Sequence, residues 1–72
     1  DNKTLIKLYP NPNRGNFTVE STEETPYTIY DLLGKEVKTG VLILGKNQIE
    51  FNIGNGLFLF KTNSNSKPII VK

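Results

Sequence analysis

Residues 16–21, NFTVES, are the stretch that indicates the fold most clearly. Their two apolar side chains, Phe17 and Val19, alternate with polar ones, so an extended chain places the two kinds on opposite faces. This period of two residues is typical of a strand with one buried face. Residues 47–53, NQIEFNI, repeat the pattern with three apolar side chains on one face.

The rest of the chain consists of short β-type runs between turn residues, without a helical period. The runs are residues 5–9, 26–31, 35–38, 57–60 and 67–72, with a shorter apolar stretch at 41–44. Residues 57–60 are apolar on both faces, which predicts a central strand, whereas Pro68 lacks an N–H donor and indicates an edge position or a strand start. About seven short antiparallel strands predict an all-β fold, a small immunoglobulin-like β-sandwich formed by residues 1–72 as one domain.

Three turns contain residues whose backbones are unusually restricted or unusually free. The loop at 9–15, YPNPNRG, has two prolines, which lack N–H donors and favour extended geometry in the residue before them. The sequence DLLG at 31–34 has aspartate first and glycine fourth, as a type I turn prefers, and GNG at 54–56 favours a reversal of the chain. The residues expected to have structural roles here are Pro10, Pro12, Gly15, Asp31, Gly34, Lys35 and Gly56.

The composition excludes several classes of function. The 72 residues contain no cysteine and no histidine, which rules out disulfides, thiolate metal sites and histidine-based catalysis. The serines lack an activating base, and the acidic residues show no pattern of a buried pair. The net charge of +2 is spread along the chain, which argues against nucleic-acid binding, and no apolar run is long enough for membrane insertion. We therefore expect neither an enzyme nor a cofactor.

Four segments, taken in order, are similar to those of a known family. They are LYPNP at 8–12, IYDLLGKEV at 29–37, GLFLFK at 56–61 and KPIIVK at 67–72. Each segment alone occurs in many proteins, but the four in this order span nearly the whole chain. The chain resembles the type A C-terminal sorting domains of cargo proteins of the bacterial type IX secretion system, also called the Por secretion system.

The resemblance implies a sorting signal rather than a catalyst. Such domains occur at the C-terminus of cargo in Bacteroidota, so we expect this chain to be the end of a larger secreted protein. The cargo first reaches the periplasm by an ordinary signal peptide, and the outer-membrane translocon then recognises the folded domain. A sortase-like cysteine protease commonly removes the domain as the cargo is secreted or attached to the cell surface. Any cleavage here is expected upstream of Tyr9, in residues 1–4 or before them.

Three parts of the chain are candidates for contact with a partner. The 9–15 loop could be displayed to the translocon, although a structural role fits its exposed residues Asn11, Asn13 and Arg14 equally well. A partly exposed Tyr30 could anchor a partner, and the last strand could pair with a receptor by strand addition or merely close its sheet. The candidate recognition residues are Tyr9, Asn11, Arg14, Tyr30, Lys67, Ile69, Ile70, Val71 and Lys72.

Two other functions remain open from the sequence. A small β-sandwich could bind carbohydrate or protein at the cell surface, for which Tyr9, Tyr27 and Tyr30 are the candidate aromatics. A purely structural terminal domain could stabilise its parent protein without directing export. The oligomeric state is also open, because unpaired edge strands permit self-association.

Overall fold

The structure, a computed structural model, describes residues 5–50 and 54–72, and within them it contains seven strands and no helix. Accordingly, no apolar helix of membrane-spanning length occurs in this described part. The strands are β1 (Ile6–Tyr9), β2 (Asn16–Ser21), β3 (Thr25–Tyr30), β4 (Glu36–Leu42), β5 (Gly45–Glu50), β6 (Gly56–Thr62) and β7 (Ser66–Val71).

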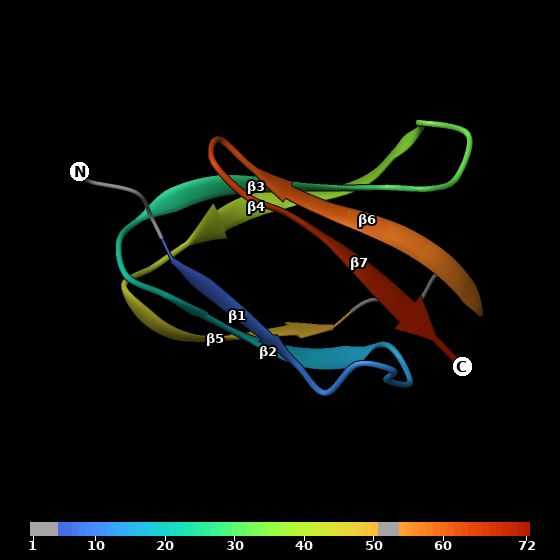
Figure 1. Cartoon of the computed structure of the whole chain (residues 1–72), viewed down its shortest axis with the longest axis horizontal. Helices are drawn as coiled ribbons and strands as arrows, with labels where there is room; N and C mark the ends of the chain where they lie inside the picture. The colour runs from blue at the N-terminus through green and yellow to red at the C-terminus, as the bar shows by residue number, and fades with distance from the viewer. Residues whose placement is uncertain (1–4, 51–53) are drawn as a thin grey trace.

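The strands form two antiparallel sheets that pack face to face (Figure 1). One sheet has the order β1-β2-β5 and the other the order β4-β3-β6-β7. The predicted all-β sandwich is thus confirmed, and its strand order is compatible with an immunoglobulin-like arrangement. The central position expected for residues 57–60 is also confirmed, because β6 lies between β3 and β7.

The core lies between the two inner faces and is centred on the ring of Phe60. The Phe17 ring of the opposite sheet meets it edge to face, with centroids 6.4 Å apart, and the Tyr27 ring stacks on it at 5.1 Å. Such aromatic pairs contribute about 0.5–1.5 kcal/mol each beyond the area they bury. The buried apolar residues are Ile6, Phe17, Val19, Tyr27, Ile29, Leu42, Ile49, Phe58, Phe60, Ile69 and Val71.

The prediction of two separate runs at 35–38 and 41–44 was wrong, because a single strand, β4, continues through Gly40. A Cβ atom at Gly40 would lie 2.8 Å from the ring of Tyr27. The glycine is therefore needed where this buried ring lies against the backbone of β4, and it does not break the strand. Burial also raises the pKa of the Tyr27 hydroxyl.

The exposed connection from β4 to β5 contains Ile43 and Leu44, the second half of the apolar stretch at 41–44. Asn47 holds this connection. Its Oδ1 accepts from the N–H of Ile43 at 2.8 Å, and its Nδ2 donates to the carbonyl oxygens of Ile43 at 3.0 Å and Val19 at 3.1 Å. The connection is thus tied to both its own strand and β2. The second half of the expected 47–53 run, with Phe51 and Ile53, lies outside the described residues.

The turn between β3 and β4 has the geometry expected from its sequence. The Asp31 carboxylate accepts hydrogen bonds from the N–H groups of Leu33 and Lys35, both at 2.9 Å. The N–H of Gly34 donates to the Asp31 carbonyl oxygen at 3.0 Å, and Gly34 has a φ of 84°. The turn therefore has the hydrogen bonds and the positive φ that its aspartate and glycine favour, because glycine adopts such a φ at little cost.

Candidate functional site: the terminal strand and the outer face of its sheet

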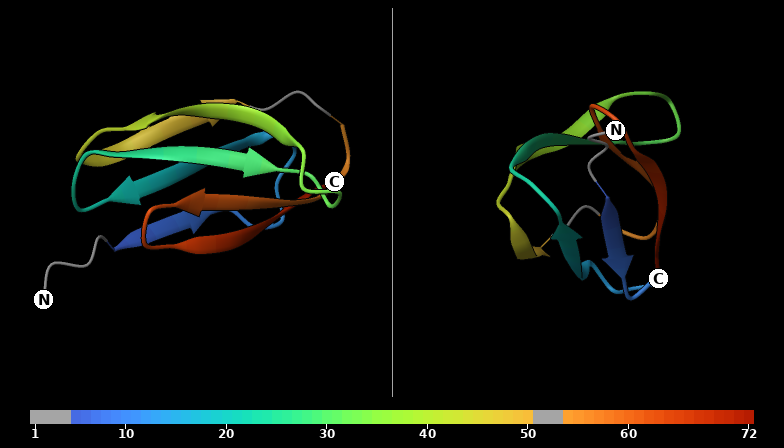
Figure 2. Two further views of the ribbon diagram at one scale, coloured as in Figure 1. Left: turned by 90° about the horizontal axis from the view of Figure 1, so that it is seen from above. Right: turned by 60° about the vertical axis from the view of Figure 1, so that its left-hand side comes forward.

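The loop between β1 and β2 lies along the outer edge of β7, far from it in sequence (Figure 2). The side-chain amide of Asn11 bonds to β7 as a neighbouring strand would. Its Nδ2 donates to the carbonyl oxygen of Pro68 at 3.0 Å, and its Oδ1 accepts from the N–H of Ile70 at 2.9 Å. Two backbone groups that an edge strand would otherwise leave unpaired are therefore satisfied.

Asn13 extends this contact through its backbone. Its N–H donates to the carbonyl oxygen of Ile70, and its carbonyl oxygen accepts from the N–H of Lys72, both at 2.8 Å. Its side chain holds the loop, because Oδ1 accepts from Gly15 N–H at 2.9 Å and Nδ2 donates to the Pro10 carbonyl oxygen at 3.2 Å. Asn13 is only 5% exposed, so the prediction that it is exposed was wrong. We call Asn11 and Asn13 together the asparagine clamp.

The clamp changes what the last strand can do. One edge of β7 pairs with β6, and the outer edge is bonded to the clamp from Pro68 to Lys72. A partner strand can pair at this edge only by displacing the clamp. The edge position predicted for Pro68 is confirmed, and its missing N–H falls on the outer side, where no bond to β6 is lost.

Four residues of the last strand, all candidates for partner contact, have different environments. Ile69 and Val71 point inward and belong to the core, with 0% and 5% of their surfaces exposed. They cannot contact a partner in the folded domain, and this part of the prediction is corrected. Lys67 is half-buried opposite Phe60. Ile70 points outward and is exposed.

The outer face of the four-stranded sheet carries two rows of apolar side chains near this strand. In one row Tyr30, Leu59 and Pro68 are partners across β3, β6 and β7. In the next row Leu57 faces Ile70, and these two side chains are 43% and 41% exposed. We call these five residues the apolar face. Antiparallel strands usually place polar side chains on a solvent-facing side, so this surface is unusual.

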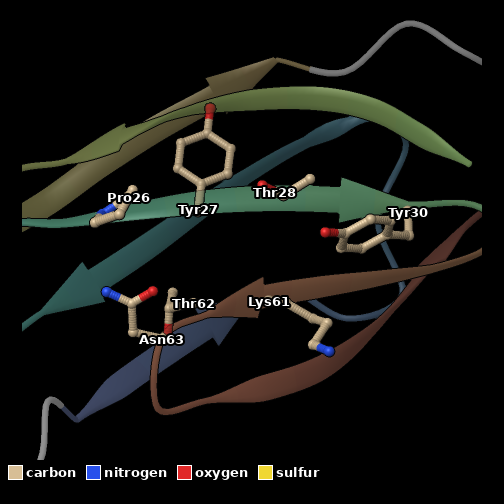
Figure 3. A pocket seen from close by; sticks show the side chains of 7 residues that line it. All are labelled: Pro26, Tyr27, Thr28, Tyr30, Lys61, Thr62 and Asn63. Carbon is tan, nitrogen blue, oxygen red and sulfur yellow. The ribbon is translucent and has the colours of Figure 1, made fainter. Parts of the chain in front are cut away.

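Two hollows open on this side of the sheet. One, of about 330 Å³, lies between the β3–β4 turn and the apolar face, where Leu32, Leu57 and Pro68 line it. The other, of about 200 Å³, adjoins Tyr30 further along β3 and β6. Figure 3 shows that Tyr30 and Lys61 project on the same side of the sheet at this second hollow. A shallow, mostly apolar surface with a cation at one end results.

The charges around the apolar face are divided by sign between its two ends. The β6–β7 hairpin and the residue after it, 56–72, contain Lys61, Lys67 and Lys72 but no acidic residue. Two acidic residues lie on the β3–β4 side. Glu36 is the cross-strand partner of Tyr30, and the carboxylate of Asp31 accepts hydrogen bonds from its own turn.

Two further candidate residues lie in β1 and in the loop that follows it. Tyr9 is on the outer face of the three-stranded sheet, where its hydroxyl donates a hydrogen bond to the carboxylate of Glu20. This bond raises the pKa of Tyr9, with smaller contributions from desolvation and from the charge of Glu20. Arg14 is exposed in the loop, between the clamp residue Asn13 and Gly15. The structure therefore brings Asn11, Tyr30 and Ile70 to one region and leaves Tyr9 on the opposite sheet.

Sequence reasoning did not identify Leu57, Leu59 or Pro68 as part of a surface. A signal was present, because residues 57–60 are apolar on both faces, which was interpreted only as a central position. The pairing of Leu59 with Tyr30 and Pro68 depends on a register between distant segments, and no local pattern reveals it. Among the residues that the structure describes, no group of acidic side chains could hold a metal ion.

A known protein family matches most of the chain. The family described as "Secretion system C-terminal sorting domain" matches residues 7–72 of the 72-residue chain. The match includes both the loop that carries the asparagine clamp and the last strand. Searches of curated proteins and of solved structures found no significant match.

Proposed function

Because the chain belongs to the family of type IX secretion-system C-terminal sorting domains, we propose that its folded sandwich is the form in which the outer-membrane translocon recognises it. As a member of this family, the domain is a sorting signal that interacts with the type IX system and directs export across the outer membrane, to the cell surface or the medium. The observation that carries the proposal is that the two terminal motifs of the matched region form one structure, the clamp on β7.

This arrangement supports recognition of a folded domain rather than of a linear tail. The loop residues at 11–13 and the strand residues at 68–72 come together only when the sandwich has formed. The alternating residues of β7 are also divided between the core and the surface, so the strand presents a defined set of side chains. A receptor that binds this region therefore recognises the folded domain.

We also propose the finer steps that the family resemblance implied. The cargo reaches the periplasm by its own signal peptide, and a sortase-like cysteine protease removes the domain after export. Cleavage upstream of Tyr9 would leave the whole sandwich on the released fragment; residues 1–4, where it is proposed, lie outside the described residues. Intact-mass analysis of secreted cargo tests this step, and a product that still carries residues 9–72 would contradict it.

The experiment that tests the function is an export assay. Residues 1–72 are fused to the C-terminus of a fluorescent reporter that carries a signal peptide, in a bacterium with a working type IX system and in its translocon-deficient mutant. We expect the reporter at the surface or in the medium only in the working strain. A folded fusion that stays in the periplasm of both strains would overturn the proposal.

The alternative of a carbohydrate-binding module gains no support from the described residues. Its candidate aromatics do not form a row, because Tyr27 is in the core while Tyr9 and Tyr30 lie on opposite outer faces. We propose a non-catalytic role for the same domain, because the family to which it belongs is one of sorting signals.

A further inference from the structure

We propose that the apolar face, together with Lys61, docks onto an apolar surface bordered by acidic residues on a component of the type IX machinery. The inference deepens the proposed function and rests on it. It assigns the contact to the outward side chains of β6 and β7 and to Tyr30, rather than to the backbone edge of the last strand.

The closed edge of β7 is the first step of the argument. Backbone groups from Pro68 to Lys72 are bonded to the asparagine clamp, so pairing with a receptor strand would first cost those hydrogen bonds. The side chains on the adjoining face carry no such constraint. Ile70 contributes to both features, because its backbone is held by the clamp while its side chain remains exposed.

The second step is the nature of the face. A contiguous exposed apolar patch on a small protein indicates an interaction site more often than isolated apolar residues do. Leu57 and Ile70 are exposed neighbours, and the next row adds the ring of Tyr30. Interface centres are enriched in aromatic residues and depleted of charge, which agrees with the absence of charged residues from the five members of this face.

The third step is charge, which selects the partner. On β6 the next outward side chain after Leu59 is Lys61, and the whole 56–72 segment contains lysines and no acid. The complementary surface therefore carries acidic residues opposite Lys61. Such pairing at the border of an apolar contact contributes more to association rate and specificity than to affinity.

The test uses the reporter fusion with two sets of matched variants. The first set compares Leu57→Thr/Ile70→Thr with Ile43→Thr/Leu44→Thr. Ile43 and Leu44 are 59% and 70% exposed, and they lie in the β4–β5 connection, away from the apolar face. Threonine keeps a strand-forming side chain. The thermal midpoint of each purified variant verifies that it folds.

The expected result is that the face variant loses export by about tenfold or more, as for truncation of interface anchors, while the connection variant is exported like the unchanged fusion. Equal export of the two variants overturns the docking surface and leaves the proposed function intact. Failure of the unchanged fusion to be exported overturns the proposed function, and the docking surface with it.

The second set tests the charge and remains decisive if the apolar variant does not fold. Lys61→Gln and Lys46→Gln each remove one positive charge from an exposed strand position, but on opposite sheets. We expect slower export with Lys61→Gln only. Equal export of the two would overturn the acidic border of the proposed partner.

Discussion

The two outer faces of the sandwich differ in how their side chains are matched. On the three-stranded sheet, Lys7, Glu20 and Lys46 face one another across β1, β2 and β5, so opposite charges alternate along the row. On the four-stranded sheet, the equivalent rows are the apolar pair of Leu57 and Ile70 and the row through Leu59. The charged side chains of the first face lie next to opposite charges and are compatible with water, whereas the second face leaves apolar surface exposed to it.

This difference shows where a small domain can place a recognition surface. The core must use most of its large apolar side chains for stability, yet β6 is apolar on its outer side as well. The outer face of the three-stranded sheet, here called the polar face, has cross-strand pairs of opposite charge, and each pair contributes about 0.2–1 kcal/mol to stability. The side chains of the apolar face are not covered by any pairing within the sheet, and a docked partner would bury them.

The largest change in stability is expected from Asn13→Ala. It removes the side-chain bonds that hold the loop to Gly15 and Pro10 from a buried position, and we expect a loss of about 2 kcal/mol in the free energy of unfolding. Urea denaturation measures it, with Asn63→Ala at an exposed turn as the control, expected within about 0.5 kcal/mol of the unchanged protein. A loss no larger than that of the control would show that the clamp is not needed.

A smaller and more local effect is expected from Asn11→Ala. The change removes two exposed hydrogen bonds to β7 and costs about 1–2 kcal/mol. The amide of Ile70 should exchange with solvent faster, relative to that of Ile69, because successive backbone groups of a strand point to opposite edges and Ile69 faces β6. Equal acceleration at both amides would instead indicate general loosening of the hairpin.

Local patterns predicted the strands and turns well. The alternation in residues 16–21 and the aspartate and glycine of residues 31–34 determine structure through contacts within a few residues, and both are confirmed. The clamp could not be found in this way. The side-chain bonds of Asn11 join residues that are separated in sequence by 57 and by 59 positions. An asparagine in a turn-rich loop has the same local sequence whether it faces water or a distant strand.

The failure at residues 41–44 has a related cause. Gly40 looks like a break in the sequence, but the ring of Tyr27 on the neighbouring strand requires a residue without a side chain there. The apolar face was missed for the same reason, since it exists only in the register of β3, β6 and β7. The side chains of each strand are visible in the sequence, but which strands become neighbours is decided by the fold.

Alkaline pH is expected to destabilise the domain through two tyrosines, one in the core and one on the outer face of the three-stranded sheet. The pKa of Tyr27 is raised by burial, and that of Tyr9 by its hydrogen bond to Glu20. Because a raised pKa in the folded state favours the neutral form, the stabilisation is fully present below the unfolded value of about 10 and is lost as the pH rises through the folded values. Thermal midpoints between pH 8 and 11.5 test this, and a midpoint that stays constant to the upper limit would contradict it.

The smallest effect is expected from Glu20→Gln, on the polar face. It removes the negative charge between Lys7 and Lys46, which should lower the free energy of unfolding by about 0.5 kcal/mol. It should also lower the pKa of Tyr9 toward its ordinary value. Ultraviolet titration of tyrosine detects the shift. Export of the reporter should be unchanged. A loss of export comparable to that of the Leu57→Thr/Ile70→Thr variant would show that the translocon recognises the three-stranded sheet, which would contradict this account.

The most direct test of the central claim is photo-crosslinking of cargo during export. A photoreactive amino acid is placed at position 57, on the apolar face, or at position 48, an exposed position on the outer face of the three-stranded sheet. The account predicts a covalent adduct with a type IX component from position 57 and none from position 48. An adduct from position 48 alone, or from neither position in an exported fusion, would contradict recognition through the four-stranded sheet.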